Sequence, residues 1–166
     1  MSRTPASLKI LVVDDNPHIC TIVSALLQQT GFGQVRTATS GPEALDILKV
    51  WDADAAVIDC LMEPMDGLEL TRRLRKPTSP NPTLPIVMMT SYTERARILE
   101  ARDAGVSELV AKPIVPARLL ARLNAAVFQP RPFVKSTGYT GPSRRRATPG
   151  AGGPRRRLSD KTVQLV

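Results

Sequence analysis

Five polar side chains, each placed directly after a short apolar stretch, are the residues of this sequence whose types could do chemistry together. Three carboxylates in one crevice repel one another strongly unless a cation offsets their charge. Oxygen ligands suit a hard ion, and one or two carboxylates completed by water and phosphate oxygens are the usual pattern for Mg²⁺. A hydroxyl and an ammonium group are suited to hold phosphoryl oxygens. The five residues are Asp14, Asp15, Asp59, Thr90 and Lys112.

We therefore expect this set to stabilise a phosphoryl group carried on an aspartate, provided that folding brings the five residues together. Two plainer alternatives stay open. Asp59 could simply cap the turn that follows it. Lys112 could neutralise an acid in a structural cluster that holds no metal.

The elements that must position these residues alternate regularly between apolar runs and helical patterns. Five such pairs predict a parallel α/β sheet with helices on both faces, because crossover connections are right-handed. The expected strand order is 2-1-3-4-5, the doubly wound, flavodoxin-like arrangement, in which the first and third strands flank the ligand-binding switch point. The predicted strands are 8–13, 34–38, 55–58, 86–89 and 106–111, and the predicted helices begin near 17, 41, 68, 94 and 115 and end near 30, 48, 76, 104 and 128.

Composition and charge divide the chain in two. The 166 residues have room for one full core, which we place at residues 1–128, and a tail, residues 129–166. Residues 1–128 carry 14 basic and 14 acidic side chains, whereas the tail carries nine basic residues against one acid and so supplies the whole net charge of +8. No apolar run reaches the roughly 20 residues that span a bilayer. With two scattered cysteines, we expect a cytoplasmic protein with reduced thiols.

The tail contains five prolines and five glycines with scattered apolar residues, so we expect it to be largely disordered and to add no second domain. Clustered arginines suit bidentate binding of phosphate. Candidate ligands are nucleic acid, a cyclic dinucleotide such as cyclic diguanylate, an anionic membrane surface or an acidic protein, and a solvated tail without a ligand is the plain alternative. The two arginine clusters comprise Arg144, Arg145 and Arg146, and Arg155, Arg156 and Arg157.

Over residues 8–128 the chain resembles the receiver domain of response regulators, in outline a chemotaxis-type single-domain regulator. The resemblance implies that Asp59 is the phosphoacceptor, that Asp14, Asp15 and Asp59 hold Mg²⁺ with the backbone carbonyl of Leu61, and that Thr90 and Lys112 contact the phosphoryl group. It implies a histidine kinase or histidine phosphotransferase as donor and a downstream protein as target. The motifs that carry it are Val12-Val13-Asp14-Asp15, Val57-Ile58-Asp59, Met65-Asp66-Gly67, Thr90-Ser91 and Lys112-Pro113.

Three positions depart from the family pattern. The proline that usually follows the methionine comes one residue late, at Pro64, although the loop length to Gly67 is expected to be unchanged. Leu109 stands where the family has its aromatic switch residue. Leu61 and Tyr92 occupy the positions that flank the path of attacking water, and we expect their bulk to slow loss of the phosphoryl group.

Three classes of function compete. The leading prediction is a phosphorylation-dependent switch of a two-component phosphorelay that acts by protein–protein interaction and is no enzyme beyond slow self-dephosphorylation. A phosphohydrolase of the haloacid dehalogenase type would need a second acid where Leu61 stands, and a cap domain. A pseudo-receiver, whose arginine-rich tail takes an anionic ligand as the main input, is the third.

Overall fold

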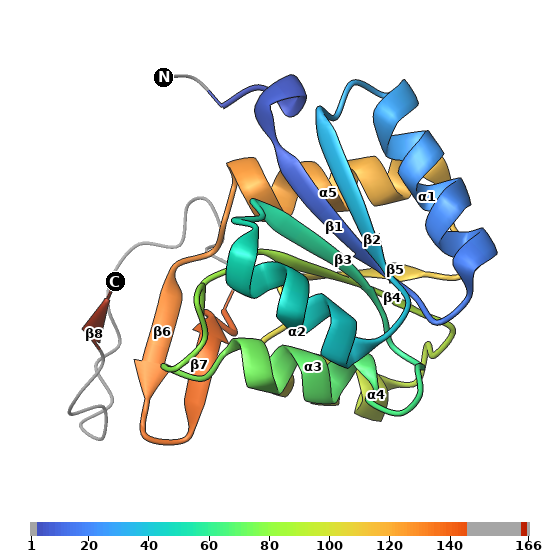
Figure 1. The fold of residues 1–166 in the computed structure, drawn as a ribbon. Coiled ribbons are helices and arrows are strands. Elements are labelled where there is room, and N and C mark those ends of the chain that lie inside the picture. Colours follow the sequence, from blue (N-terminus) through green and yellow to red (C-terminus); the bar gives the residue numbers. More distant parts are fainter. Residues whose placement is uncertain (1–2, 146–163, 166) are drawn as a thin grey trace, which may run out of the picture.

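A computed structural model describes residues 3–145 and 164–165 of the chain. Its centre is a five-stranded parallel sheet in the order β2-β1-β3-β4-β5, as predicted (Figure 1). The three central strands β1, β3 and β4 are buried on both faces, which explains their continuous apolar runs, whereas the edge strand β2 is more polar and mostly exposed. They are β1 (Lys9–Val13), β2 (Gln34–Ala38), β3 (Ala55–Asp59), β4 (Ile86–Thr90) and β5 (Glu108–Ala111).

Five helices cover the two faces of this sheet (Figure 1). Apolar residues of α1 and α5 pack against one face, and those of α2, α3 and α4 pack against the other. The helices are α1 (Pro17–Gln29), α2 (Gly41–Val50), α3 (Gly67–Leu74), α4 (Arg95–Ala104) and α5 (Pro116–Phe128), with a short 3₁₀ helix, η1 (Pro5–Ser7), before β1.

Alternate residues of one strand serve the two cores. In β1, Ile10 and Val12 belong to the layer under α1 and α5, while Leu11 and Val13 belong to the layer under α2 and α3. Successive side chains of a strand point to opposite faces, so each strand contributes to both layers. This buried sheet fixes the register that brings the strand ends together at one edge.

Local signals set where the helices begin and end. The side chain of Asn16 accepts a hydrogen bond from the amide of His18 at the start of α1, and Asp66 accepts one from Glu69 at the start of α3. Gly105 ends α4 with φ of 100°, a left-handed conformation that favours glycine. No helix among the described residues is long and apolar enough to cross a membrane.

The structure differs from the expectation for the start of the tail. Instead of an irregular chain, β6 (Phe133–Ser136) and β7 (Tyr139–Pro142) form an antiparallel hairpin, and β8 (Gln164–Leu165) pairs with β6. Two-stranded hairpins are marginal alone. This one rests against the body of the domain at the amino ends of β4 and β5, where it can bury surface that the tail sequence alone does not provide.

Candidate functional site

The five predicted residues stand at the carboxyl edge of the parallel sheet. Asp59 and Thr90 are the last residues of β3 and β4, Asp14 directly follows β1, and Lys112 directly follows β5. Adjacent strands pair in register up to this edge, with Val13 beside Ile58 and Thr90 beside Ala111. Parallel pairing therefore delivers side chains from four neighbouring strands to one place.

The three acids form a compact cluster with the lysine beside it. Carboxylate oxygens of Asp14, Asp15 and Asp59 all lie within 4.8 Å of one another. The ammonium Nζ of Lys112 lies 2.6 Å from Oδ1 of Asp59 and 4.0 Å from Oδ2 of Asp14. Asp14 and Asp59 are 2% and 3% exposed, while Asp15 is exposed. The alternative in which Asp59 only caps a turn does not account for this convergence.

One of these carboxylates is poorly compensated. Oδ1 of Asp14 accepts a hydrogen bond from the amide of Asn16 at 2.9 Å, but the buried Oδ2 has no hydrogen-bond partner among the described residues. Burial raises the pKa of Asp14, and the nearby charge of Asp59 raises it further, against the lowering effect of the Asn16 amide and Lys112. An unpaired buried carboxylate oxygen beside two further carboxylates fits the oxygen ligands of a hard divalent cation.

The hydroxyl of Thr90 faces the loop that leads into α4. Thr90 is buried, and its Oγ1 accepts a hydrogen bond from the amide of Tyr92 at 3.0 Å. A hydroxyl can donate its own proton at the same time. Thr90 can therefore donate to an anion at the strand edge while it holds the first turn of the following loop.

The connection from β3 to α3 is tightly closed. The amide of Gly67 donates to the carbonyl of Cys60, so the chain returns to β3 seven residues after leaving it. A Cβ at Gly67 would overlap the carbonyl oxygen of Asp59, which only glycine avoids. The sequence motif contained Gly67, but this close approach to the acid was not predictable from the motif alone.

Comparison with known proteins agrees with this site. The family model of the response regulator receiver domain matches residues 10–124. The chain belongs to this family.

Relatives and solved structures support the assignment. Chemotaxis protein CheY-3 of Vibrio cholerae is 36% identical over 118 residues, which cover 71% of this chain and 90% of that protein. Response regulator MprA of Mycobacterium bovis is 35% identical over 126 residues, 76% of this chain and 53% of that protein. A crystal structure of the V. cholerae chemotaxis protein CheY4 has a TM-score of 0.67 at 33% identity and covers 72% of this chain and 98% of that one.

A second solved structure carries a metal. The receiver domain of a sensor histidine kinase from Pseudomonas aeruginosa is described with a magnesium ion coordinated in its active-site cleft. It has a TM-score of 0.66 at 28% identity and covers 74% of this chain and 99% of that one.

The positions where this receiver domain departs from its family lie around the acid cluster. The side chain of Leu61 is 54% exposed. Tyr92 and Leu109 are half-buried and pack against the same apolar cluster under α4, and the guanidinium of Arg97 lies 5.1 Å above the Tyr92 ring. The aliphatic Leu109 thus sits in the packed layer beside Tyr92.

The described arginines of the predicted anion-binding set make contacts away from the acid cluster. Of the six, Arg144 and Arg145 are described; Arg146 and Arg155–Arg157 lie outside the described residues. Arg144 pairs with Asp103 at 3.4 Å and lies 4.3 Å above the ring of Tyr139. It therefore acts as a contact within the domain, which the sequence did not predict.

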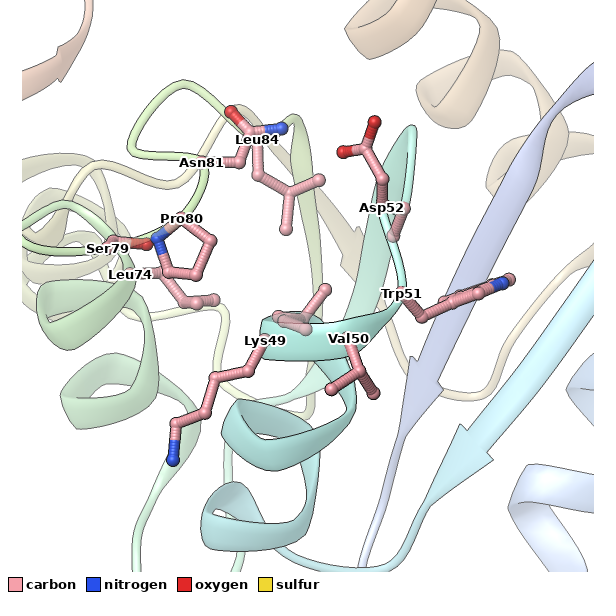
Figure 2. A pocket seen from close by; sticks show the side chains of 11 residues that line it. Lys49, Val50, Trp51, Asp52, Leu74, Ser79, Pro80, Asn81 and Leu84 are labelled. Atoms are coloured by element: carbon pink, nitrogen blue, oxygen red, sulfur yellow. The ribbon is translucent and has the colours of Figure 1, made fainter.

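A separate hollow of about 440 Å³ lies between the end of α2 and the loop before β4 (Figure 2). Leu74 and Leu84 line it together with the polar side chains of Ser79 and Asn81. Trp51 points away from the other labelled side chains, and Arg36 stacks on its ring at 4.8 Å. None of the residues lining the hollow belongs to the acid cluster.

Proposed function

We propose that this receiver domain is a phosphorylation-dependent switch in which Asp59 accepts the phosphoryl group. The observation that carries the proposal is the geometry around Asp59. A buried carboxylate lies beside two further acids and 2.6 Å from the ammonium of Lys112. The membership of the chain in the response regulator family supports a role in two-component signalling.

In the transfer step, a carboxylate oxygen of Asp59 attacks phosphorus. The bond from phosphorus to the imidazole nitrogen of a phosphohistidine breaks as the bond to Asp59 forms. The electron pair of the broken bond stays on the imidazole. The proposed donor is the phosphohistidine of a histidine kinase or a histidine phosphotransferase. A small acyl phosphate can donate the phosphoryl group in its place.

Mg²⁺ would be held by Asp14, Asp15 and Asp59 with the backbone carbonyl of Leu61. When bound, it neutralises charge that develops on the phosphoryl oxygens. The buried, unpaired Oδ2 of Asp14 supports this assignment, as does the magnesium in the P. aeruginosa receiver domain.

Lys112 and Thr90 recognise the product. The Lys112 ammonium now contacts the Asp59 carboxylate and would transfer this contact to a phosphoryl oxygen. The hydroxyl of Thr90 would donate a hydrogen bond to a second phosphoryl oxygen. Because the Thr90 Oγ1 also accepts from the Tyr92 amide, a shift of Thr90 reaches the loop before α4. We propose that a downstream protein binds differently to the domain after this change.

We further propose that the domain is no enzyme beyond slow loss of its own phosphoryl group. Leu61 and Tyr92 are apolar neighbours of the acid cluster that reduce the access of water. The double variant Leu61→Asn with Tyr92→Glu should lose its phosphoryl group several-fold faster than wild type, measured as decay of the phosphoprotein. Ile22→Asn, which changes an exposed apolar residue on α1, is the control. Equal half-lives would remove this role of the two residues.

The central test is phosphorylation by acetyl phosphate and Mg²⁺, followed by the intact mass of the protein. Wild type should gain one phosphoryl group, and Asp59→Asn should gain none. Asp46→Asn, which changes an exposed acid on α2, should behave as wild type. A wild-type protein that stays unmodified, or an Asp59→Asn variant that is modified equally, would contradict the assignment. The first result would favour a pseudo-receiver.

A further inference from the structure

Helix α4 connects the acid cluster to the hairpin of β6 and β7. It begins five residues after Thr90, and it ends at Gly105, against the hairpin. Of its ten residues, Ala101 and Ala104 are the buried ones. Small buried side chains hold a helix weakly to a core, and weakly packed elements are those that shift most easily. The contacts at the far end of α4 are therefore important for its position.

The hairpin holds the last turn of α4 from one side. The hydroxyl of Tyr139 donates to the carbonyl of Pro142 at 2.7 Å within the hairpin and lies 3.4 Å from the carbonyl of Arg102, and Arg144 pairs with Asp103 at 3.4 Å. The backbones of the hairpin and of the end of α4 approach closely beside the Tyr139 ring. A Cβ on Gly141 would lie 2.9 Å from the Cα of Gly105.

Two further guanidinium groups fix the hairpin to the start of β5. Arg131 donates to the carbonyls of Ser107 and Ser143, and so it ties the segment on both sides of the hairpin to the body. Arg75, which is buried, donates to the carbonyl of Gly105 at 3.0 Å and lies 5.0 Å from the ring of Phe133. The hairpin thus surrounds the junction between α4 and β5.

We propose that the segment 131–144 is a strap that holds α4 in the arrangement of the unphosphorylated protein and is loosened when Asp59 is phosphorylated. This inference rests on the proposed function of Asp59. The strap contacts coexist with the ion pair between Lys112 and Asp59, which a phosphoryl group on Asp59 would replace. A displacement of α4 that follows Thr90 and its loop towards a phosphoryl group would break the contacts to Arg102 and Asp103 at the other end of the helix.

Linkage makes the effect reciprocal. If phosphorylation weakens docking of the strap, then weakening the strap must favour phosphorylation by the same factor. The chain provides a matched pair of variants for this purpose. Arg144→Ala removes the contacts to Asp103 and Tyr139, whereas the adjacent Arg145 makes no side-chain contact that depends on its guanidinium among the residues 3–145.

The experiment is hydrogen exchange of the full chain, with and without acetyl phosphate and Mg²⁺, with the intact mass recorded in parallel. Phosphorylation should accelerate exchange in the peptides that cover 133–142 and the end of α4 by about 5-fold or more, the lower range of allosteric coupling. Arg144→Ala should accelerate exchange there before phosphorylation and raise the phosphorylated fraction. Arg145→Ala should do neither.

A charge swap provides the second measurement. The double variant Arg144→Asp with Asp103→Arg should restore slow exchange that Arg144→Asp alone loses, because the pair is re-formed with opposite signs. A wild type that gains its phosphoryl group while exchange over 133–142 stays unchanged would overturn the strap and leave the proposed function intact. A wild type that gains no phosphoryl group would overturn the proposed function, and the strap with it.

Discussion

The two ends of the central sheet differ in the sign of their buried charges and in the groups that surround those charges. At the carboxyl edge, three carboxylates converge within 4.8 Å around one ammonium group, which lies 2.6 Å from Oδ1 of Asp59, and the buried Oδ2 of Asp14 has no hydrogen-bond donor among the described residues. At the amino ends of β4 and β5, Nε and Nη1 of Arg75 and both Nη atoms of Arg131 donate to backbone carbonyls, and Nη2 of Arg75 is left without a partner among the described residues. The first end keeps charge in excess and suits binding of a cation. The second uses charge to fasten one part of the chain to another.

The largest change in stability should come from a substitution at the amino ends of β4 and β5. Arg75→Met keeps the volume of the side chain but leaves the carbonyls of Gly105 and Pro82 without their donor. An unpaired buried carbonyl costs about 1–3 kcal/mol, and relief from burying the charge offsets part of that cost. We expect a net loss of about 2 kcal/mol in the free energy of unfolding, measured by urea denaturation.

Arg73, half-exposed in the last turn of α3 and two residues before Arg75, serves as control. Arg73→Met should change the free energy of unfolding by less than about 0.5 kcal/mol, because an exposed ion pair contributes little. If Arg75→Met were as stable as wild type, the guanidinium would not fasten the end of α3 to Gly105 and Pro82, and the contrast between the two ends would fail.

At the acid end, Mg²⁺ should stabilise the fold. At ten times its dissociation constant, a ligand that binds only the folded protein adds about 1.4 kcal/mol to the free energy of unfolding. A melting temperature that rises with Mg²⁺ concentration and falls back on addition of a chelator is the expected result. The rise should be absent in Asp14→Asn and present in Asp103→Asn, a surface acid at the far end of α4.

The smallest effect should be the gain from removing one of the crowded charges. Asp14→Asn without Mg²⁺ removes a desolvated carboxylate that lies beside Asp59, so the free energy of unfolding should rise by about 1 kcal/mol. Denaturation in the presence of a chelator measures it. A loss of stability would mean that the pairing of Asp14 with Lys112 and Asn16 outweighs the repulsion, and the acid end would then be as well compensated as the arginine end.

The carboxyl edge was predictable because buried parallel strands appear in the sequence as short apolar runs. Continuous apolar runs followed at once by Asp14, Asp59, Thr90 and Lys112 gave the strand order and the residues that meet. Strand β5 starts at Glu108, two residues later than expected, because the amide of Val106 instead bonds to the carbonyl of Ala101 at the end of α4.

The hairpin was missed because its stability comes from docking and not from its own apolar residues. Phe133 and Tyr139 are half-buried against the body, and Gly141 and Pro142 are buried there. A signal existed in Thr137 and Gly138, two turn residues between stretches that contain β-branched and aromatic side chains, a pattern typical of a hairpin. The high content of Pro, Gly and Arg around it obscured this pattern.

The closure of the β3–α3 loop by Gly67 has a consequence for specificity. Both ends of that loop are fixed, one at Asp59 and the other where Gly67 touches its carbonyl oxygen. An exposed residue between them, such as Glu63, can be exchanged without moving the carboxylate. Substitutions on the outer surface of this loop can therefore select a new donor or target while the position of the Asp59 carboxylate stays the same.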